Sequence, residues 1–199
     1  MDPANTFFTS DTHYAHRNIC AATSRWTGDR LDAVLRPHLS LSAMNDAIVE
    51  GINRVVPEDG VLYHLGDWSF GGASSMFEMR GRVNCRTVHL VLGNHDKITP
   101  ENKGLFADVH EYLELAVPGS VCEGGKVVLF HYPMDHWNKG HRGSLHLHGH
   151  MHYAPGARIK GRRMDVGVDG RRGSGREYEP YSLIEVADLL RDGTPHSHH

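Results

Sequence analysis

The chain has 199 residues, a formal charge of −3 and a hydrophobic fraction of 39%, which together are typical of one soluble domain. No apolar run approaches the roughly 20 residues of a membrane-spanning helix, and the first residues lack the basic start of a secretory signal. The negative charge argues against broad electrostatic affinity for nucleic acid. We therefore expect one cytoplasmic domain over 1–199, with 191–199 as a flexible tail and no membrane partner.

The unusual feature of the composition is its 17 histidines. They are concentrated between His131 and His152, and imidazole is the commonest metal-ligating side chain, so the enrichment favours a metal site. His198 and His199 end the chain and are left out of this argument. The three cysteines are far apart and lack paired spacing, which predicts reduced thiols rather than a zinc knuckle.

The first half of the chain alternates between two kinds of segment. Apolar runs predict strands at 6–10, 61–65 and 87–92, and apolar spacings of three and four predict helices at 40–55 and around 75–83. Strand, helix, strand, helix, strand is the order of a doubly wound α/β layer.

Beyond Pro100 the pattern changes and little helix intervenes. Strand-like runs follow at 109–117, 126–130, 144–148 and 164–168, and a helix at 183–190. A second, more antiparallel sheet packed on the first accounts for this order.

Five of the apolar runs end in an Asp, Asn or His. The residues delivered in this way are Asp11, His13, Asp67, Asn94, His95, Asp96, His131, His150 and His152. Ligands of open α/β sheets usually bind at the strand ends, so we expect these side chains to form one site.

Seven of these residues are candidate metal ligands: Asp11, His13, Asp67, Asn94, His131, His150 and His152. A structural zinc site needs only four ligands and is usually rich in thiolate, so seven oxygen and nitrogen donors fit two ions better. Asp67, from the central strand, is the natural bridge.

His150 and His152 could share one face of an extended strand or diverge at the turn after Gly149. We expect them to diverge to separate ions, because each ion needs an imidazole. For His146 and His148 we expect a solvent-facing strand ladder instead.

Together the strand-end motifs resemble the five signature blocks of the calcineurin-like metallophosphoesterases. The blocks are Asp11-x-His13, Gly66-Asp67, Gly93-Asn94-His95-Asp96, Phe130-His131-Tyr132-Pro133 and Gly149-His150-x-His152. They occur in the family's order and span 142 of 199 residues, counted from Asp11 to His152. The resemblance is closest to the small stand-alone bacterial and phage-type members.

The resemblance implies a four-layer α/β/β/α sandwich of two mixed sheets with two divalent metal ions, most often manganese, with iron, zinc or nickel as alternatives. It also implies two ligand sets and a histidine, His95, that contacts the phosphate together with Asn94. The first set is Asp11, His13, Asp67 and His152, and the second is Asp67, Asn94, His131 and His150.

Such a centre suits phosphoester hydrolysis, because two ions lower the pKa of a bridging water and the resulting hydroxide can attack in line. His95 could protonate the departing alkoxide, with Asp96 orienting its imidazole, or it could be a structural loop residue. His16 and Trp137 are further candidate substrate contacts. For His16 the alternative is a solvated loop, and for Trp137 it is core or rim packing.

No cap domain is evident, so we expect an open cleft and a phosphodiesterase acting on a small or nucleotide-like phosphoester. A phosphomonoesterase, a protein phosphatase and a nuclease acting on DNA or RNA are the alternatives. A non-catalytic scaffold is expected to lose ligands, and here none is missing. The basic residues from Arg158 to Arg176 could attract a polyanion or form a solvated loop.

Overall fold

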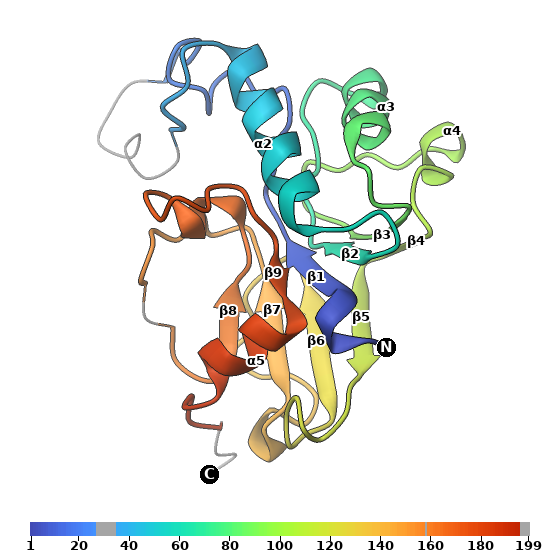
Figure 1. Cartoon of the computed structure of the whole chain (residues 1–199), viewed down its shortest axis with the longest axis vertical. Coiled ribbons are helices and arrows are strands. Elements are labelled where there is room, and N and C mark those ends of the chain that lie inside the picture. The colour runs from blue at the N-terminus through green and yellow to red at the C-terminus, as the bar shows by residue number, and fades with distance from the viewer. Residues whose placement is uncertain (27–34, 158, 196–199) are drawn as a thin grey trace.

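The computed structural model describes residues 1–26, 35–157 and 159–195. Two mixed β-sheets are flanked by helices, which confirms the predicted α/β sandwich (Figure 1). Residue 158 and residues 196–199 of the predicted tail lie outside the described residues.

The first sheet has the strand order β4-β3-β2-β1-β9. Its strands are β1 (Thr6–Thr9), β2 (Val61–His64), β3 (Thr87–Val91), β4 (Asp108–His110) and β9 (Tyr181–Ser182). The first four are mutually parallel, and β9 pairs antiparallel with β1 at one edge. The predicted alternation of strand and helix is confirmed for this half of the chain, but the layer is not doubly wound, because the second sheet rather than helices covers its other face.

Helices α2 (Leu41–Val55) and α3 (Ala73–Arg82) connect the parallel strands and lie on the same side of the first sheet, near the short α4 (Pro100–Lys103) (Figure 1). The Ser40 side chain caps α2 by accepting a hydrogen bond from the Ala43 N–H. Apolar residues of both helices, including Met44 and Met79, pack against the sheet in one buried cluster.

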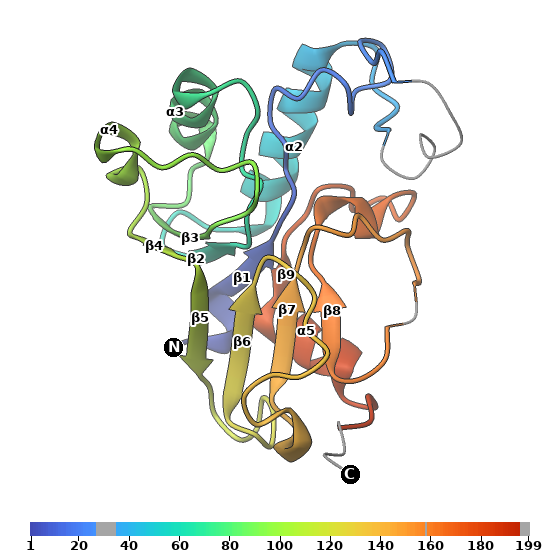
Figure 2. The same cartoon turned by 180° about the vertical axis from the view of Figure 1, so that it is seen from behind.

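The second sheet has the order β5-β6-β7-β8. Its strands are β5 (Tyr112–Ala116), β6 (Lys126–Phe130), β7 (Leu145–His148) and β8 (Arg163–Asp165). Only β5 and β6 pair antiparallel, and the other two pairs are parallel (Figure 2). The expectation of a more antiparallel sheet is therefore wrong. Long connections between β6, β7 and β8 allow parallel pairing where hairpins would not.

Two predicted strands differ from the observed ones: one is divided in two, and the other ends early. Residues 109–117 divide at the exposed Glu111 into β4 and β5, which belong to different sheets. Residues 164–168 leave the sheet after Asp165, and Val168 begins a 3₁₀ turn. Alternating apolar residues indicate that one face of a strand is buried. Because the alternation continues when the chain passes from one sheet to the other, it does not mark the end of a strand.

The two sheets share an apolar cluster to which helix α5 (Leu183–Leu190) also contributes. On the other face of β7, His146 and His148 are fully buried, so the expected solvent-facing ladder is wrong. Met134 donates its backbone N–H to His146 Nε2, and the Trp137 ring lies 5.4 Å from the His146 ring. The loop after β6 therefore covers this face.

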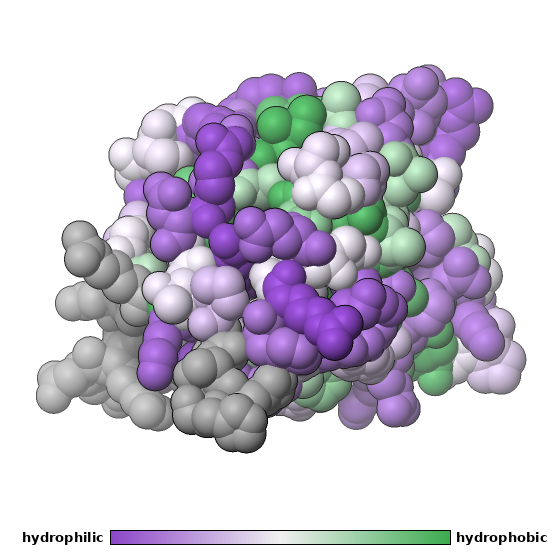
Figure 3. All heavy atoms as spheres, turned by 90° about the horizontal axis from the view of Figure 1, so that it is seen from below, coloured by the Kyte–Doolittle hydropathy of each residue, from purple (hydrophilic) through white to green (hydrophobic). Residues whose placement is uncertain are grey.

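The end of the molecule opposite α2 and α3 is mostly hydrophilic, with hydrophobic side chains in several places among the polar ones (Figure 3). Among the described residues, no helix has the length and apolar character needed to cross a membrane.

Candidate metal centre

The candidate ligands come together at the ends of strands from both sheets. Strands β1, β2 and β3 are parallel, so the residues that follow them emerge at one edge. Residues that follow β6 and β7 meet them there: Gly149 donates its N–H to the His131 carbonyl, and the His150 N–H reaches the Asp11 carboxylate at 2.9 Å. All five predicted segments contribute to this group.

One set of nitrogen and oxygen atoms surrounds Asp11. His13 Nε2 lies 3.2 Å from His152 Nε2 and 3.8 Å from Asp11 Oδ1, and His152 Nε2 lies 3.7 Å from the same oxygen. Ligand atoms of these three residues all lie within 4.8 Å of one another, as do those of Asp11, Asp67 and His131.

Asp67 lies between the two predicted ligand sets. Its Oδ2 is 3.5 Å from His13 Nε2 and 3.6 Å from His131 Nε2. On the far side, Asn94 Oδ1 is 3.1 Å from both His131 Nε2 and His150 Nδ1. The side-chain contacts of Asp67 therefore extend to both sets, which is the arrangement that a bridging carboxylate requires.

The backbone at these positions adopts a conformation that non-glycine residues rarely use. Eight non-glycine residues in the described part of the chain have positive φ angles, and five of them are candidate ligands. The five are Asp11, His13, Asp67, His150 and His152. Strained backbone concentrates at functional sites, so this distribution is independent support for the group.

Two imidazoles are oriented by hydrogen bonds on the side away from the centre. His131 Nδ1 donates to the Leu65 carbonyl at 2.7 Å, and His152 Nδ1 donates to the Asp169 carboxylate at 2.7 Å. Both bonds place a proton on Nδ1, so in the neutral imidazole the Nε2 lone pair faces the carboxylates. Metal-binding histidines are commonly fixed in this way.

Asp169 and Arg36 support the centre from behind, and no motif in the sequence predicts either of them. The Arg36 guanidinium makes two 3.2 Å contacts with the Asp169 carboxylate and donates to the backbone carbonyls of Asp11 and Thr12. Although burial alone would raise it, Arg36 and His152 hold the pKa of Asp169 well below its ordinary value. The ionised carboxylate is thereby available to His152.

The centre has too little positive charge to stabilise all of its buried carboxylates in the ionised form. Burial raises the pKa of the Asp11 carboxyl to about 8, and the Asp67 carboxylate adds to that shift while His152 opposes it. Burial also lowers the pKa of His13 well below its ordinary value, which keeps the imidazole neutral. Neutral imidazoles and buried carboxylates are a donor set that suits a divalent cation.

His95 lies beside the donors but outside both ligand groups. Its ring is exposed and 5.5 Å from the His13 ring, and its backbone N–H donates to Asp67 Oδ1 at 2.9 Å. Asp96, the residue predicted to orient the His95 imidazole, contacts backbone groups of two loops. Its carboxylate accepts backbone N–H bonds from Asp67, Trp68 and Gly93 at 2.8–3.0 Å. These bonds connect the loop after β2 to the loop after β3.

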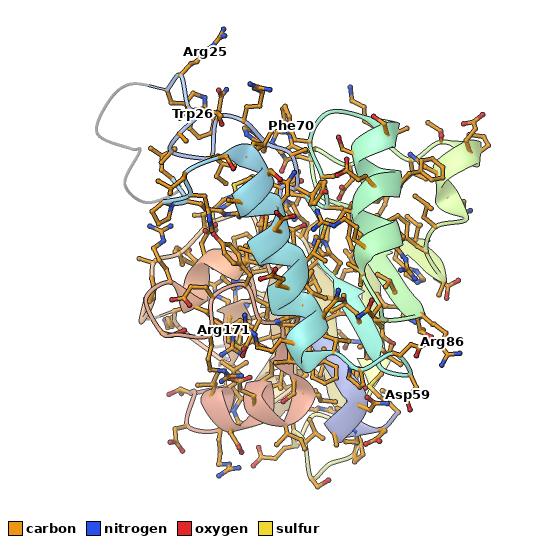
Figure 4. All side chains as sticks on the ribbon, turned by 45° about the horizontal axis from the view of Figure 1, so that its top comes forward. Arg25, Trp26, Asp59, Phe70, Arg86 and Arg171 are labelled. Carbon is orange, nitrogen blue, oxygen red and sulfur yellow. The ribbon has the colours of Figure 1, made fainter. Side chains whose placement is uncertain are left out.

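Aromatic side chains line two sides of the centre. His16 is buried between Phe70, at 4.0 Å, and Trp26, at 5.7 Å, and Phe70 also lies 5.4 Å from His95. Trp26 and Phe70 are partly exposed at the end of the molecule where α2 begins (Figure 4). On the other side, the exposed Tyr132 lies 4.7 Å from His150.

Trp137 and the basic segment do not join this group. Trp137 is buried, and its indole N–H donates to the Ser144 carbonyl, which matches the core-packing alternative. The basic residues Arg162, Arg163, Arg171 and Arg176 each pair with at least one carboxylate. Arg158 lies outside the described residues. These pairs support the solvated-loop alternative over a patch that attracts polyanions.

Two glycines allow the loops to approach the candidate ligands closely. A Cβ at Gly93 would lie 2.3 Å from Asp67 Oδ1, and one at Gly149 would lie 2.2 Å from Asp11 Oδ2. Any side chain at either position would displace a carboxylate of the centre.

No family profile matches the chain. The Gene 66 protein of Mycobacterium phage L5 is 29% identical over 192 residues, covering 83% of this chain and 87% of that protein. Among solved structures, the protein of unknown function AQ665 from Aquifex aeolicus matches with a TM-score of 0.64 and 22% identity, covering 92% of this chain and 98% of that one. This likeness shows a shared fold.

A predicted phosphoesterase from Streptococcus pneumoniae matches with a TM-score of 0.37 and 18% identity, covering 82% of this chain and 70% of that one. A score this low carries no argument about function.

Proposed function

We propose that the protein is a metal-dependent phosphoesterase with a dinuclear centre, and that its preferred substrates are phosphodiesters. The observation that carries the proposal is the convergence of seven oxygen and nitrogen donors from five segments, with Asp67 Oδ2 within 3.6 Å of an imidazole from each ligand set. A mononuclear site would leave about half of these donors without a role.

The donor set fits two divalent ions such as Mn²⁺. Asp11, His13, Asp67 and His152 would hold one ion, and Asp67, Asn94, His131 and His150 the other. When bound, the pair would supply a water of lowered pKa and neutralise charge on the phosphate.

The chain's own residues then orient the ester and move a proton. Asn94 and His95 are exposed beside the donors and would contact the phosphate. His95 is outside both ligand groups, so its imidazole is free to donate a proton to the departing alkoxide oxygen. The backbone bond from His95 to Asp67 couples its position to the proposed bridging carboxylate.

The preference for diesters follows from the shape of the rim. Asp11, Asp67 and His131 form a buried floor, whereas Asn94, His95 and His150 are exposed. Phe70 and Tyr132 offer partly exposed rings on two sides of this opening, 40% and 38% exposed respectively. A diester could place one substituent against each ring, and stacking of an aromatic group contributes about 1–3 kcal/mol.

The test is an activity panel on metal-depleted protein that has been reloaded with manganese. Bis-aryl and mono-aryl phosphates, cyclic nucleotides, dinucleotides and oligonucleotides are compared, with Asp67→Asn as the inactive control. We expect turnover of the diesters to be fastest. Turnover of the monoester alone would overturn the diester preference, and inactivity on every phosphoester would overturn the proposal itself.

A further inference from the structure

A second group of imidazole and carboxylate side chains lies on the edge of the first sheet. Strands β3 and β4 are parallel, and their register pairs His89 with Asp108 and Val91 with His110. Residues that alternate along a strand share one face, so His89, Asp108 and His110 project from the same side. One ligand atom from each lies within 4.8 Å of the other two.

The geometry of this group leaves a nitrogen without a hydrogen-bond partner. His89 Nδ1 is buried and makes no hydrogen bond, although Asp108 Oδ2 lies only 3.4 Å away. The His89 ring is held in place by the Tyr63 ring, which stacks on it at 4.7 Å with an interplanar angle of 12°. The imidazole is therefore fixed with an unused nitrogen beside the carboxylate.

The group is accessible from solvent. β4 is the edge strand of its sheet, and the side chain of Asp108 is 62% exposed. A hydrated cation could reach it without opening the core, because two of its three side chains belong to this edge strand.

We infer that His89, Asp108 and His110 form a separate binding site for a divalent transition-metal ion of the Zn²⁺ type. Two imidazoles and one carboxylate are a common protein ligand set for zinc, whose remaining coordination position can take water. His89 lies within β3, five residues before Asn94, and none of the three residues belongs to the groups formed by the candidate ligands. The group therefore contributes no ligand to the candidate centre.

An ion at this site would act on the fold and, through it, on the strand end that carries Asn94. β4 has only three residues, and its attachment to β3 continues through the Leu92 N–H, which donates to the His110 carbonyl at 2.8 Å. A cation that joins His89 to Asp108 and His110 would connect the two strands through their side chains as well. Binding to the folded state alone raises the stability of that state.

The test measures zinc bound to the full chain after removal of all metals with a chelator. The variants are Asp108→Asn and His110→Ala, and the matched control is His141→Ala, which removes an exposed histidine outside the group. We expect each test variant to bind one zinc ion fewer than the wild type, and the control to match the wild type. The terminal histidines are common to all these proteins, so their contribution cancels.

Loss of a residue that hydrogen-bonds to a metal ligand weakens metal binding about 10–100-fold. Loss of a zinc ligand itself should raise the dissociation constant for zinc by more than that. Zinc should also raise the melting temperature of His141→Ala more than that of His110→Ala. Equal zinc content in the wild type and both test variants would overturn the inference. Asp108→Asn preserves the shape of the side chain, so its result stands even if His110→Ala folds poorly.

This inference and the proposed function can fail separately. If the activity panel is negative and Asp108→Asn still loses one zinc ion, only the phosphoesterase proposal falls. If phosphodiesters are hydrolysed and Asp108→Asn retains every zinc ion, only the edge site falls.

Discussion

Replacement of Asp169 by asparagine tests whether the buried ion pair behind the centre positions His152. The carboxylate is 3% exposed and its partner Arg36 is 1% exposed, so solvent screens their interaction little. Asp169→Asn removes the negative charge opposite the guanidinium and leaves one amide oxygen, beside the carbonyls of Asp11 and Thr12, to accept from it. It also replaces the charged partner of His152 with a neutral amide.

Two effects of different size are expected. Removing one partner of a buried ion pair costs about 3–5 kcal/mol, which for a chain of this length lowers the melting temperature by about 6–20 °C. Loss of the hydrogen-bonded carboxylate behind a metal-binding histidine lowers metal affinity about 10–100-fold. The folded-state pKa of Asp169 is depressed, so its contribution to stability is present at neutral pH and is lost as the pH falls through the acid range.

The assay combines urea unfolding of the metal-free protein with a manganese titration. Asp188→Asn is the matched control, because Asp188 pairs with Arg191 on the surface, where both side chains are more than half exposed. We expect the control to change stability by less than about 1 kcal/mol. If Asp169→Asn were as stable as this control and bound manganese with wild-type affinity, the positioning role would be refuted.

Four further outcomes are expected. His95→Ala should keep the wild-type metal content but lose about 100-fold or more of its turnover on esters with poor leaving groups, and unchanged kcat on such an ester would remove the acid role. Asp67→Asn should bind less metal by elemental analysis, and retention of two ions per chain would exclude the bridge. Gly149→Ala would place a Cβ 2.0 Å from Ser10 Oγ, so urea unfolding should show a loss of at least about 1–3 kcal/mol, and an unchanged midpoint would contradict the crowding argument. Because burial raises the pKa of Asp11 from 3.8 to about 8, the stability it contributes to the metal-free protein is present at low pH and is lost as the pH rises towards 8. Between pH 7 and 8, above the range in which Asp169 and the buried histidines of lowered pKa titrate, the melting temperature of the metal-free protein should therefore fall, and a flat profile there would show that Asp11 is already ionised.

The grouping of the candidate ligands could be predicted because each one follows an apolar run. Parallel pairing of β1, β2 and β3 brings Asp11, Asp67 and Asn94 to one edge, and the strand order that predicts this pairing is visible in the sequence. The break at Glu111 could not be predicted in the same way. The apolar pattern on either side of Glu111 predicts a strand with one buried face. It does not indicate which of the two sheets the strand joins.

The residues that support the centre could not be identified from local patterns. Arg36 and Asp169 are 133 residues apart in the chain, and the link between them exists only after the two sheets have packed. Asp96 shows a related difficulty. Its place next to His95 suggested contact with that imidazole, but its carboxylate turns towards backbone N–H groups of the neighbouring loop.

The conformational strain at the centre indicates that folding and metal binding are coupled. A left-handed backbone costs about 1–2 kcal/mol per non-glycine residue, so the five candidate ligands with positive φ together cost about 5–10 kcal/mol. That sum is comparable with the whole stability of a typical domain. The packing of the two sheets and the Arg36–Asp169 pair must offset this cost in the metal-free protein. A pair of cations binding only to the folded chain would add to its stability, and would at the same time neutralise the buried carboxylates of Asp11 and Asp67.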